Sequence, residues 1–333
     1  MNGTGSTRTL ARVSAVRTIA QDIVELTLVA QGGRFAPYEA GAHVRLHLGD
    51  GLERSYSLCG EPADGSRYVI AVRLEPASRG GSAAVHRLRA GDTLALSGPF
   101  NLFPVDWSEP CLVLLAGGIG ITPVYAMALE AARRGHPFEL HYFVRSHEHA
   151  AYADELRRLG LTAATQLHVG LDPVAVRAQV EAIVRRMHGG EGLYVCGPRP
   201  MIELAREVAG GTLAPGRIHW ESFGGGEAAA AAAGAADSDS EQPADTPFEI
   251  RLASGEGPFE VPAGQSALQV LLAAGIDVPH SCREGECGMC VVDVVEGVPE
   301  HHDHFLSDAV RAGNGCMALC VSRARTASIV VDF

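Results

Sequence analysis

The chain reads S-C-R-E-G-E-C-G-M-C over residues 281–290, and this stretch sets the character of its C-terminal part. Cys282, Cys287 and Cys290 stand at a C-x4-C-x2-C spacing, and Cys320 follows near the chain end. Four thiolates at this spacing are typical of a [2Fe–2S] cluster. A zinc site or a disulfide pair is the alternative, but zinc sites usually carry two short C-x2-C clips and this loop has one. The spacing therefore predicts an iron–sulfur electron carrier.

Around the cysteines, residues 247–333 are expected to form a small β-grasp domain of class α+β. Alternating apolar residues predict short strands, and Ser266 is a candidate N-cap for one helix. Cys316 lies four residues before Cys320 and is a second candidate for the last thiolate. The expected elements are strands 248–252, 259–261, 291–296 and 328–331 and a helix over 266–274.

The net charge of −12 is concentrated in the C-terminal part of the chain. Residues 247–333 carry −7, and residues 227–246, which hold no large apolar side chain, carry −5 and are interpreted as a flexible linker. Residues 1–226 are balanced, which argues against nucleic acid as a partner. The acidic surface could steer the domain toward a basic protein partner, or serve only solubility.

Residues 107–226 predict a doubly wound α/β domain. A continuous apolar run over 111–116 indicates a strand buried on both faces, and the turn 117–120 with Gly117, Gly118 and Gly120 follows it. Thr122 is a candidate N-cap of the next helix. Strands and helices then alternate, which places a site at the strand carboxyl ends. The turn is not a strict G-x-G-x-x-G, so a structural turn is the alternative.

Residues 8–106 predict a small antiparallel β-barrel, because short alternating strands are separated by glycine turns. Within it, Arg54 and Tyr56 share one strand face, where a cation and an aromatic ring could hold a flat phosphorylated cofactor. Gly80, Gly81 and Ser82 open a short expected helix, whose free N–H groups could bind a phosphate. Each signal alone is weak, and Tyr56 alone would indicate a packed strand residue.

Length and composition fit several domains. The chain has 333 residues, 47% of them hydrophobic, and no apolar core follows Met1 that would mark a secretory signal. The uncharged run 110–129 is broken by three glycines and Pro123, so it is not interpreted as a membrane span. The eight cysteines fit a reducing cytoplasm.

Taken in order, these motifs resemble the phthalate dioxygenase reductase family, in which an FMN barrel, an NADH domain and a plant-type ferredoxin follow one another. The resemblance is carried by R-S-Y-S-L over 54–58, A-G-G-I-G-I-T-P over 116–123, C-G-P over 196–198, E-S-F over 221–223, the cysteine loop, and C-V-S-R-A over 320–324. It covers nearly the whole chain apart from the linker, which is longer and richer in alanine than is usual in the family.

The resemblance implies a role for each matching residue. Side chains of the barrel strands, together with Phe223, would contact the isoalloxazine ring. The glycine turn of the barrel would bind the FMN phosphate. The dinucleotide would lie on the second glycine turn, and Cys320 rather than Cys316 would complete the iron ligands. The implied flavin contacts are Arg54, Tyr56, Ser57, Ala71, Val72, Arg73 and Phe223; the phosphate contacts Gly80, Gly81 and Ser82; the NADH contacts Gly117, Gly118, Gly120, Thr122 and Cys196; and the iron ligands Cys282, Cys287, Cys290 and Cys320.

The implied activity is transfer of electrons from NADH through FMN and the [2Fe–2S] cluster to a separate Rieske-type non-haem iron oxygenase. A flavin suits this position because it takes two electrons together and releases them singly. The alternatives are a reductase that serves a cytochrome P450, and an electron-relay subunit that does not turn over NADH. The oxygenase substrate would be a small organic acid, an aromatic compound or a quaternary amine.

Two further features stay open at this point. Arg145-Ser146 follow the second α/β strand, where a protein reads the adenosine 2′ position, so NADPH is an alternative to NADH. The stretch E-H-H-D-H over 300–304 is expected to be a solvated loop, with a second metal site as the alternative.

Overall fold

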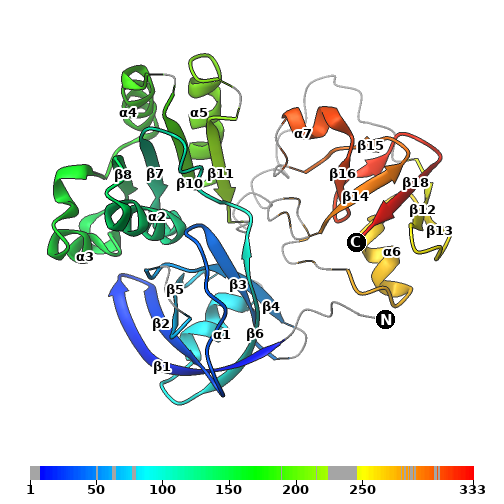
Figure 1. Cartoon of the computed structure of the whole chain (residues 1–333), viewed down its shortest axis with the longest axis horizontal. Helices are drawn as coiled ribbons and strands as arrows, with labels where there is room; N and C mark the ends of the chain where they lie inside the picture. The colour runs from blue at the N-terminus through cyan, green and yellow to red at the C-terminus, as the bar shows by residue number, and fades with distance from the viewer. Residues whose placement is uncertain are drawn as a thin grey trace. The chain divides into compact units, whose positions relative to one another are not determined.

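The computed structural model describes residues 8–49, 52–61, 65–76, 80–188, 190–214, 216–223, 246–278, 280, 283, 285, 288, 290–303, 306 and 308–333. The chain divides into two compact units, Met1–Phe223 and Gly224–Phe333 (Figure 1). Two of the predicted iron ligands, Cys282 and Cys287, lie outside the described residues, as does nearly all of the predicted linker.

The first sheet of unit 1 is antiparallel and six-stranded, in the order β4-β3-β6-β1-β2-β5. A bridge between Leu58 and Ile70 joins its two edges, so the sheet curls into a barrel. Alternate residues fill the interior, as the period-2 pattern predicts, and Leu46 and Leu58 are fully buried there. The elements are β1 (Thr9–Ala20), β2 (Ile23–Ala30), β3 (Ala42–His47), β4 (Glu53–Ser57), β5 (Tyr68–Arg73), α1 (Gly81–Arg87) and β6 (Thr93–Asn101).

The second sheet of unit 1 is parallel, in the order β11-β10-β7-β8-β9. Alternate residues of β7 enter different hydrophobic clusters: Leu114 packs with α2 and α3, and Leu115 with α4 and α5. Helices therefore cover both faces, as the continuous apolar run predicts. The elements are β7 (Leu112–Gly117), η1 (Gly118–Gly120), α2 (Ile121–Arg134), β8 (Phe138–Val144), η2 (His147–His149), α3 (Ala153–Arg158), η3 (Leu161–Ala164), β9 (Thr165–Val169), α4 (Pro173–Arg186), β10 (Gly192–Gly197), α5 (Arg199–Gly210) and β11 (Ile218–Ser222).

A shared core joins the barrel to the α/β part within unit 1. One hydrophobic cluster contains Cys59 from the barrel together with Tyr125 and Tyr152 from the α/β part. The two tyrosine rings stack with their centroids 4.2 Å apart. The Cys59 thiol lies 3.0 Å from the Tyr152 hydroxyl. This packing holds the carboxyl ends of the parallel strands in a fixed position relative to the barrel.

Unit 2 contains a mixed five-stranded sheet in the order β13-β12-β18-β14-β16, covered by α6, and a separate pair β15-β17. The first strand pairs in parallel with the last, β12 with β18, as in a β-grasp. Ser266 caps α6 in a reciprocal capping box with Gln269, which confirms the predicted N-cap. The elements are β12 (Phe248–Leu252), β13 (Phe259–Val261), α6 (Ala267–Ala273), β14 (Val291–Glu296), β15 (Pro299–Glu300), α7 (Asp308–Gly313), β16 (Cys316–Ala318), β17 (Arg323–Ala324) and β18 (Ser328–Asp332).

Two sequence-based expectations about these elements were wrong or incomplete. Thr122 does not cap α2, because Gly120 occupies the N-cap position and the Thr122 hydroxyl instead donates to the Ile119 carbonyl at 3.1 Å. Strand β11, I-H-W-E-S, lacks a regular apolar pattern and was not anticipated. None of the helices in the described ranges is both long and apolar enough to span a membrane.

Candidate functional site

The barrel places Arg54 against the start of α1. A Cβ added to Gly81 would lie only 2.5 Å from Arg54 Cγ, so the absence of a side chain at Gly81 is what admits the arginine. Arg54 also donates from Nη1 to the Glu53 carbonyl at 2.7 Å. Gly80 has a φ of +90° and nothing within 4 Å of an added Cβ, so its backbone stays open to a ligand. The predicted flavin contact Arg54 thus lies beside the predicted phosphate contacts Gly80 and Gly81.

Ser82 and the end of β5 fix α1 in this position. The Ser82 hydroxyl accepts a hydrogen bond from the Glu75 amide at 3.0 Å, and the His86 ring lies 2.9 Å from the Val72 carbonyl. Arg73 pairs with Glu75 at 2.7 Å. These contacts bring the end of β5 and the start of α1 together, so the predicted contacts on both elements line one region.

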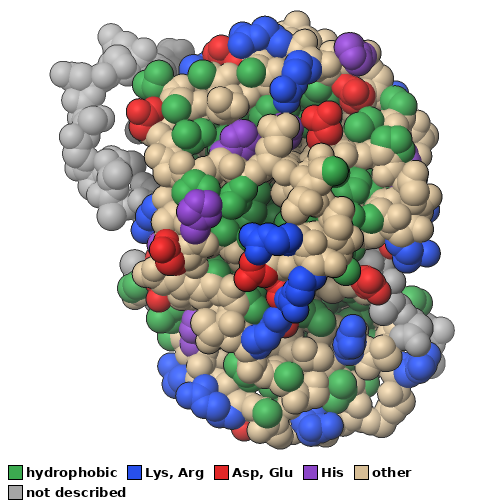
Figure 2. Space-filling model, turned by 90° about the vertical axis from the view of Figure 1, so that its left-hand side faces the viewer, with side chains coloured by type: hydrophobic (Ala, Val, Ile, Leu, Met, Phe, Trp, Pro, Cys, Tyr) green, Lys and Arg blue, Asp and Glu red, His purple; other side chains and the backbone are tan. Residues whose placement is uncertain are grey.

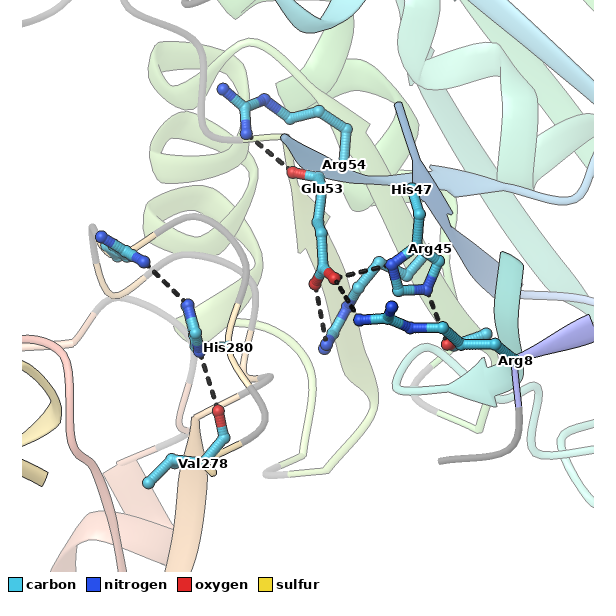
Figure 3. Close-up of polar contacts among 9 residues, drawn as sticks. Arg8, Arg45, His47, Glu53, Arg54, Val278 and His280 are labelled. Atoms are coloured by element: carbon cyan, nitrogen blue, oxygen red, sulfur yellow. Dashed lines mark hydrogen bonds and ion pairs between the residues drawn. The ribbon is translucent and has the colours of Figure 1, made fainter. Parts of the chain in front are cut away.

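A polar cluster on the outer face of the barrel orients β4 (Figure 3). The Glu53 carboxylate contacts His47 at 2.6 Å, Arg8 at 3.5 Å and Arg45 at 3.6 Å. Because side chains alternate along a strand, anchoring Glu53 on this face directs Arg54 to the other. The sequence did not indicate this cluster, since its members come from three separate segments.

The other predicted flavin contacts lie on β4, β5 and the end of unit 1. Burial raises the pKa of Tyr56 to about 12, so its ring presents a neutral hydroxyl. Ala71 and Val72 are buried, whereas Phe223 is 37% exposed after β11. An exposed aromatic side chain at this point is available to cover a flat ring.

The glycines after β7 have two different roles. A Cβ on Gly120 would lie 2.2 Å from the Cys196 carbonyl oxygen, and one on Gly117 would lie 2.6 Å from Pro198 Cδ. These two glycines therefore let the turn after β7 pack directly on the turn after β10. Gly118 differs, with a φ of +54° and open space around an added Cβ. Of the predicted dinucleotide contacts, Gly118 is thus the one whose backbone stays accessible.

Glu221, which was not among the predicted site residues, connects the two halves of the candidate site. It pairs in register with Cys196 across β10 and β11, and its Oε2 accepts a hydrogen bond from the Ser57 hydroxyl at 3.4 Å. A predicted flavin contact and a predicted nicotinamide neighbour therefore meet at one carboxyl group. The E-S-F string contains Glu221, but only strand β11, which was not predicted, places this residue beside Cys196.

The protonation of this carboxyl group is unusual. Burial raises the pKa of Glu221 from its ordinary 4.5 to about 8, and the hydrogen bond from Ser57 only partly opposes this. Burial also raises the pKa of the Cys196 thiol, and the neighbouring Glu221 adds to the effect. Both groups are therefore neutral at pH 7, and the junction between barrel and α/β part carries no charge from either.

In unit 2, the structure brings the segments of two predicted iron ligands together. Cys290 and Cys320 are both buried, and the Leu319 amide donates to the Cys290 carbonyl at 3.1 Å. A Cβ on Gly285 would lie 2.7 Å from the Val321 side chain, so the cysteine loop packs on the residue after Cys320. Cys320 also borders a pocket of about 540 Å³. Of the four predicted ligands, the described residues thus place Cys290 and Cys320 on neighbouring segments.

Cys316 is placed differently from Cys320. It lies in β16 opposite Asp293, is only partly buried, and has its thiol pKa raised by burial and then by the nearby Asp293. Cys320, whose neighbour Leu319 donates its amide to the Cys290 carbonyl, stays the predicted fourth ligand.

The described part of the histidine-rich stretch, residues 300–303, is not the solvated loop that was expected. Asp303 is buried and accepts hydrogen bonds from the Leu306 amide at 2.8 Å and the Ser322 hydroxyl at 3.4 Å. The side chain of His301 is only 8% exposed. Within the described residues no group of three or more His, Cys, Asp or Glu could hold a metal ion. Asp303 instead organises the segment beside Cys320.

Comparisons with known proteins identify two domain families in the chain. Residues 253–325 match the 2Fe-2S iron–sulfur cluster binding domain family, and residues 114–207 match the oxidoreductase NAD-binding domain family. The chain is 43% identical to a vanillate O-demethylase oxidoreductase of Pseudomonas sp. (strain HR199 / DSM 7063), covering 96% of this chain and 98% of the relative. It is 33% identical to the phthalate dioxygenase reductase of Burkholderia cepacia, over 96% of each chain.

The chain belongs to the phthalate dioxygenase reductase family. The solved structure of phthalate dioxygenase reductase, described as a modular structure for electron transfer from pyridine nucleotides to [2Fe–2S], has 34% identity and a TM-score of 0.68, covering 99% of this chain and 98% of that one. As a member of this family the chain is an oxidoreductase of the kind that serves oxygenases, with FMN, NADH and a [2Fe–2S] cluster as cofactors.

This chain is also similar to part of two larger cytochrome P450 proteins. Full-length CYP116B46 from Tepidiphilus thermophilus has 35% identity and a TM-score of 0.77, covering 97% of this chain. This chain spans 42% of the length of CYP116B46 and 41% of an intact type IV self-sufficient cytochrome P450 monooxygenase. The same arrangement of domains thus occurs in cytochrome P450 enzymes as well as in separate reductases.

Proposed function

We propose that the chain is the NADH-dependent reductase of a Rieske-type non-haem iron oxygenase. The observation that carries the proposal is the junction at Glu221, where a barrel strand bearing Ser57 meets the strand end bearing Cys196. A flavin on the barrel and a nicotinamide on the parallel sheet would face each other at this point. Relatives named for a vanillate O-demethylase and a phthalate dioxygenase support an oxygenase as the acceptor.

We assign the residues as the sequence indicates, with Glu221 added. Arg54 contacts the flavin, and the turn of Gly80, Gly81 and Ser82 holds the FMN phosphate. The accessible backbone at Gly118 receives the dinucleotide, while Gly117 and Gly120 shape the turn. Cys282, Cys287, Cys290 and Cys320 ligate iron. The corresponding domains are 8–106, 107–226 and 247–333, and every strand from β1 to β18 falls within one of these ranges.

The mechanism requires few ionisable groups from the chain. FMN, when bound, takes two electrons from NADH together and gives them up singly. Glu221 keeps its proton on the carboxyl group below about pH 8, so it places no negative charge beside Ser57. Cys196, held as a neutral buried thiol, contributes shape rather than charge. Arg54 supplies positive charge at the barrel. The two glycine turns pack directly on each other at the strand ends.

The finer choice of acceptor has one competing candidate. The similarity to CYP116B46 favours a cytochrome P450 as the acceptor of electrons from the cluster. The vanillate O-demethylase oxidoreductase and the phthalate dioxygenase reductase, which match this chain over nearly their whole length, are however named as an oxidoreductase and a reductase, as a two-component oxygenase requires. We therefore place the Rieske-type partner first, and we place the protein in the cytoplasm, where thiols stay reduced.

Reconstitution tests the acceptor. The purified reductase is combined with a Rieske-type oxygenase and, separately, with a cytochrome P450, each encoded beside its gene or taken from a related system and supplied with its substrate. The proposal expects product formation coupled to NADH consumption with the Rieske-type enzyme. Coupled turnover with the cytochrome P450 alone would assign the chain to the competing candidate.

The distribution of charge on the chain indicates which domain binds the partner protein. A space-filling view of one face shows acidic and basic side chains next to one another across its middle, without a uniform basic field (Figure 2). The excess of acidic residues lies in residues 227–333 instead. We infer that a protein partner with a basic surface docks on the ferredoxin domain, and that its association weakens as salt rises.

A further inference from the structure

The segment after β8 lies where the adenosine ribose of a dinucleotide is read. In the parallel sheet β8 is the neighbour of β7, and Phe143 pairs in register with Gly117. The carboxyl end of the second strand of such a sheet carries the group that contacts the ribose 2′ position. In this chain that end is followed by Arg145 and by η2.

The side chains of this segment are already bonded to one another. The Ser146 hydroxyl donates to the Glu148 carboxylate, and it lies 2.8 Å from Nδ1 of His149. A hydroxyl has one proton, and a carboxylate only accepts. Because that proton goes to Glu148, Nδ1 of His149 must be the donor in the second bond. Ser146 therefore has no proton left to offer to a phosphate.

Two contacts from outside hold the segment in place. The Gln21 amide, in the turn between β1 and β2, donates to the Glu148 carbonyl at 2.7 Å. The Tyr142 hydroxyl donates to the His149 carbonyl at 3.5 Å. The Glu148 carboxylate is exposed, and its pKa is lowered mainly by the hydrogen bond from Ser146. It is thus a fixed negative charge at the surface of the strand end.

We propose that Glu148 is the residue that selects NADH over NADPH. This rests on the proposed binding of the dinucleotide at the ends of β7 and β8. The carboxylate can accept a hydrogen bond from the 2′-hydroxyl of NADH. The 2′-phosphate of NADPH would instead face a carboxylate of like charge. Arg145, the residue that could favour the phosphate, is exposed, and its neighbour Ser146 is bonded to Glu148 rather than available beside it.

The test compares kcat/KM for NADH and NADPH in the complete holoenzyme, with ferricyanide as the electron acceptor, for the wild type and Glu148→Gln. The variant should gain roughly tenfold or more with NADPH, because the repulsion is removed. With NADH it should lose only about threefold, because the amide keeps an acceptor oxygen. Adding Arg145→Ala to this variant should abolish the gain with NADPH, since that gain requires the exposed cation.

Glu139→Gln is the matched control, because Glu139 is an exposed carboxylate near the other end of β8. It should leave the ratio of the two kcat/KM values within about twofold of the wild type. The inference is overturned if Glu148→Gln leaves that ratio unchanged, or if the wild type prefers NADPH. Failure of both nucleotides to reduce the wild-type flavin would instead refute the proposed function, so the two outcomes are distinguishable.

Discussion

Replacing Glu221 by Gln should remove a pH dependence from both flavin reduction and stability. The Glu221 pKa is raised to about 8, so the wild-type carboxyl group loses its proton as the pH rises through about 8. Ionisation places a negative charge at Ser57, where the proposed flavin would lie. The rate of flavin reduction by NADH should therefore fall above about pH 8. Gln is neutral at every pH and has nearly the same shape, so the variant should keep its rate.

The stability effect has a definite sign and size. A pKa raised from 4.5 to about 8 means that the folded state holds a proton that the unfolded state releases, so wild-type stability falls as the pH rises between these values. After allowance for solvent screening of a partly exposed carboxyl group, the loss should be about 1–2 kcal/mol. Above about pH 8 the carboxyl group is ionised in both the folded and the unfolded state, so it no longer makes the free energy of unfolding depend on pH. Glu221→Gln should show no such loss.

Two measurements check this. Stopped-flow reduction of the flavin under anaerobic conditions gives the rate between pH 6 and pH 10, and urea unfolding followed by flavin fluorescence gives the stability. Asp106→Asn is a suitable control, because Asp106 has a lowered pKa and is exposed, so its change should not affect the region near pH 8. If the flavin-reduction rate of Glu221→Gln fell with the same pH midpoint as that of the wild type, the role given to this carboxyl group would be refuted.

Two further changes test the turns and the iron ligands. Gly120→Ala should destabilise unit 1 by about 2–3 kcal/mol, because its Cβ would overlap the Cys196 carbonyl, and should lower the melting temperature by roughly 4–10 °C. Gly118→Ala should lower the free energy of unfolding by only about 1 kcal/mol, because of its left-handed backbone. A larger loss of stability for Gly118→Ala than for Gly120→Ala would contradict the packing argument. Cys320→Ala should abolish bound iron while NADH still bleaches the flavin, whereas Cys316→Ala should spare both, and the reverse pattern in iron content would move the ligand to Cys316.

Much of the fold was accessible from the sequence because its signals are local. Strands β12, β13 and β14 have the predicted bounds, because their apolar residues mark them directly in the sequence. Strand β11 was missed because it lies at the edge of the parallel sheet and every residue in it is only partly buried. Such a strand carries little apolar pattern.

The candidate site was predicted in its parts but not in its connections. Motifs identified Arg54 and Gly81 separately, and the structure shows that the missing Cβ of Gly81 makes room for the arginine. Glu221 could not be assigned, because its importance comes from a hydrogen bond to Ser57, 164 residues away. For the same reason the sequence could not show that Gly117 and Gly120 pack against the turn after β10 while the backbone of Gly118 stays accessible. Contacts between residues far apart in the sequence produce no motif of fixed spacing, so the sequence does not indicate them.

Anaerobic titration of the purified holoprotein with NADH tests the central claim most directly. The account predicts that NADH bleaches the flavin and that the electron paramagnetic resonance signal of a reduced [2Fe–2S] cluster then appears, with bleaching but no such signal in Cys320→Ala. Anaerobically prepared protein that contains neither flavin nor iron and acid-labile sulfide, or a loaded protein whose absorbance NADH leaves unchanged, would contradict it.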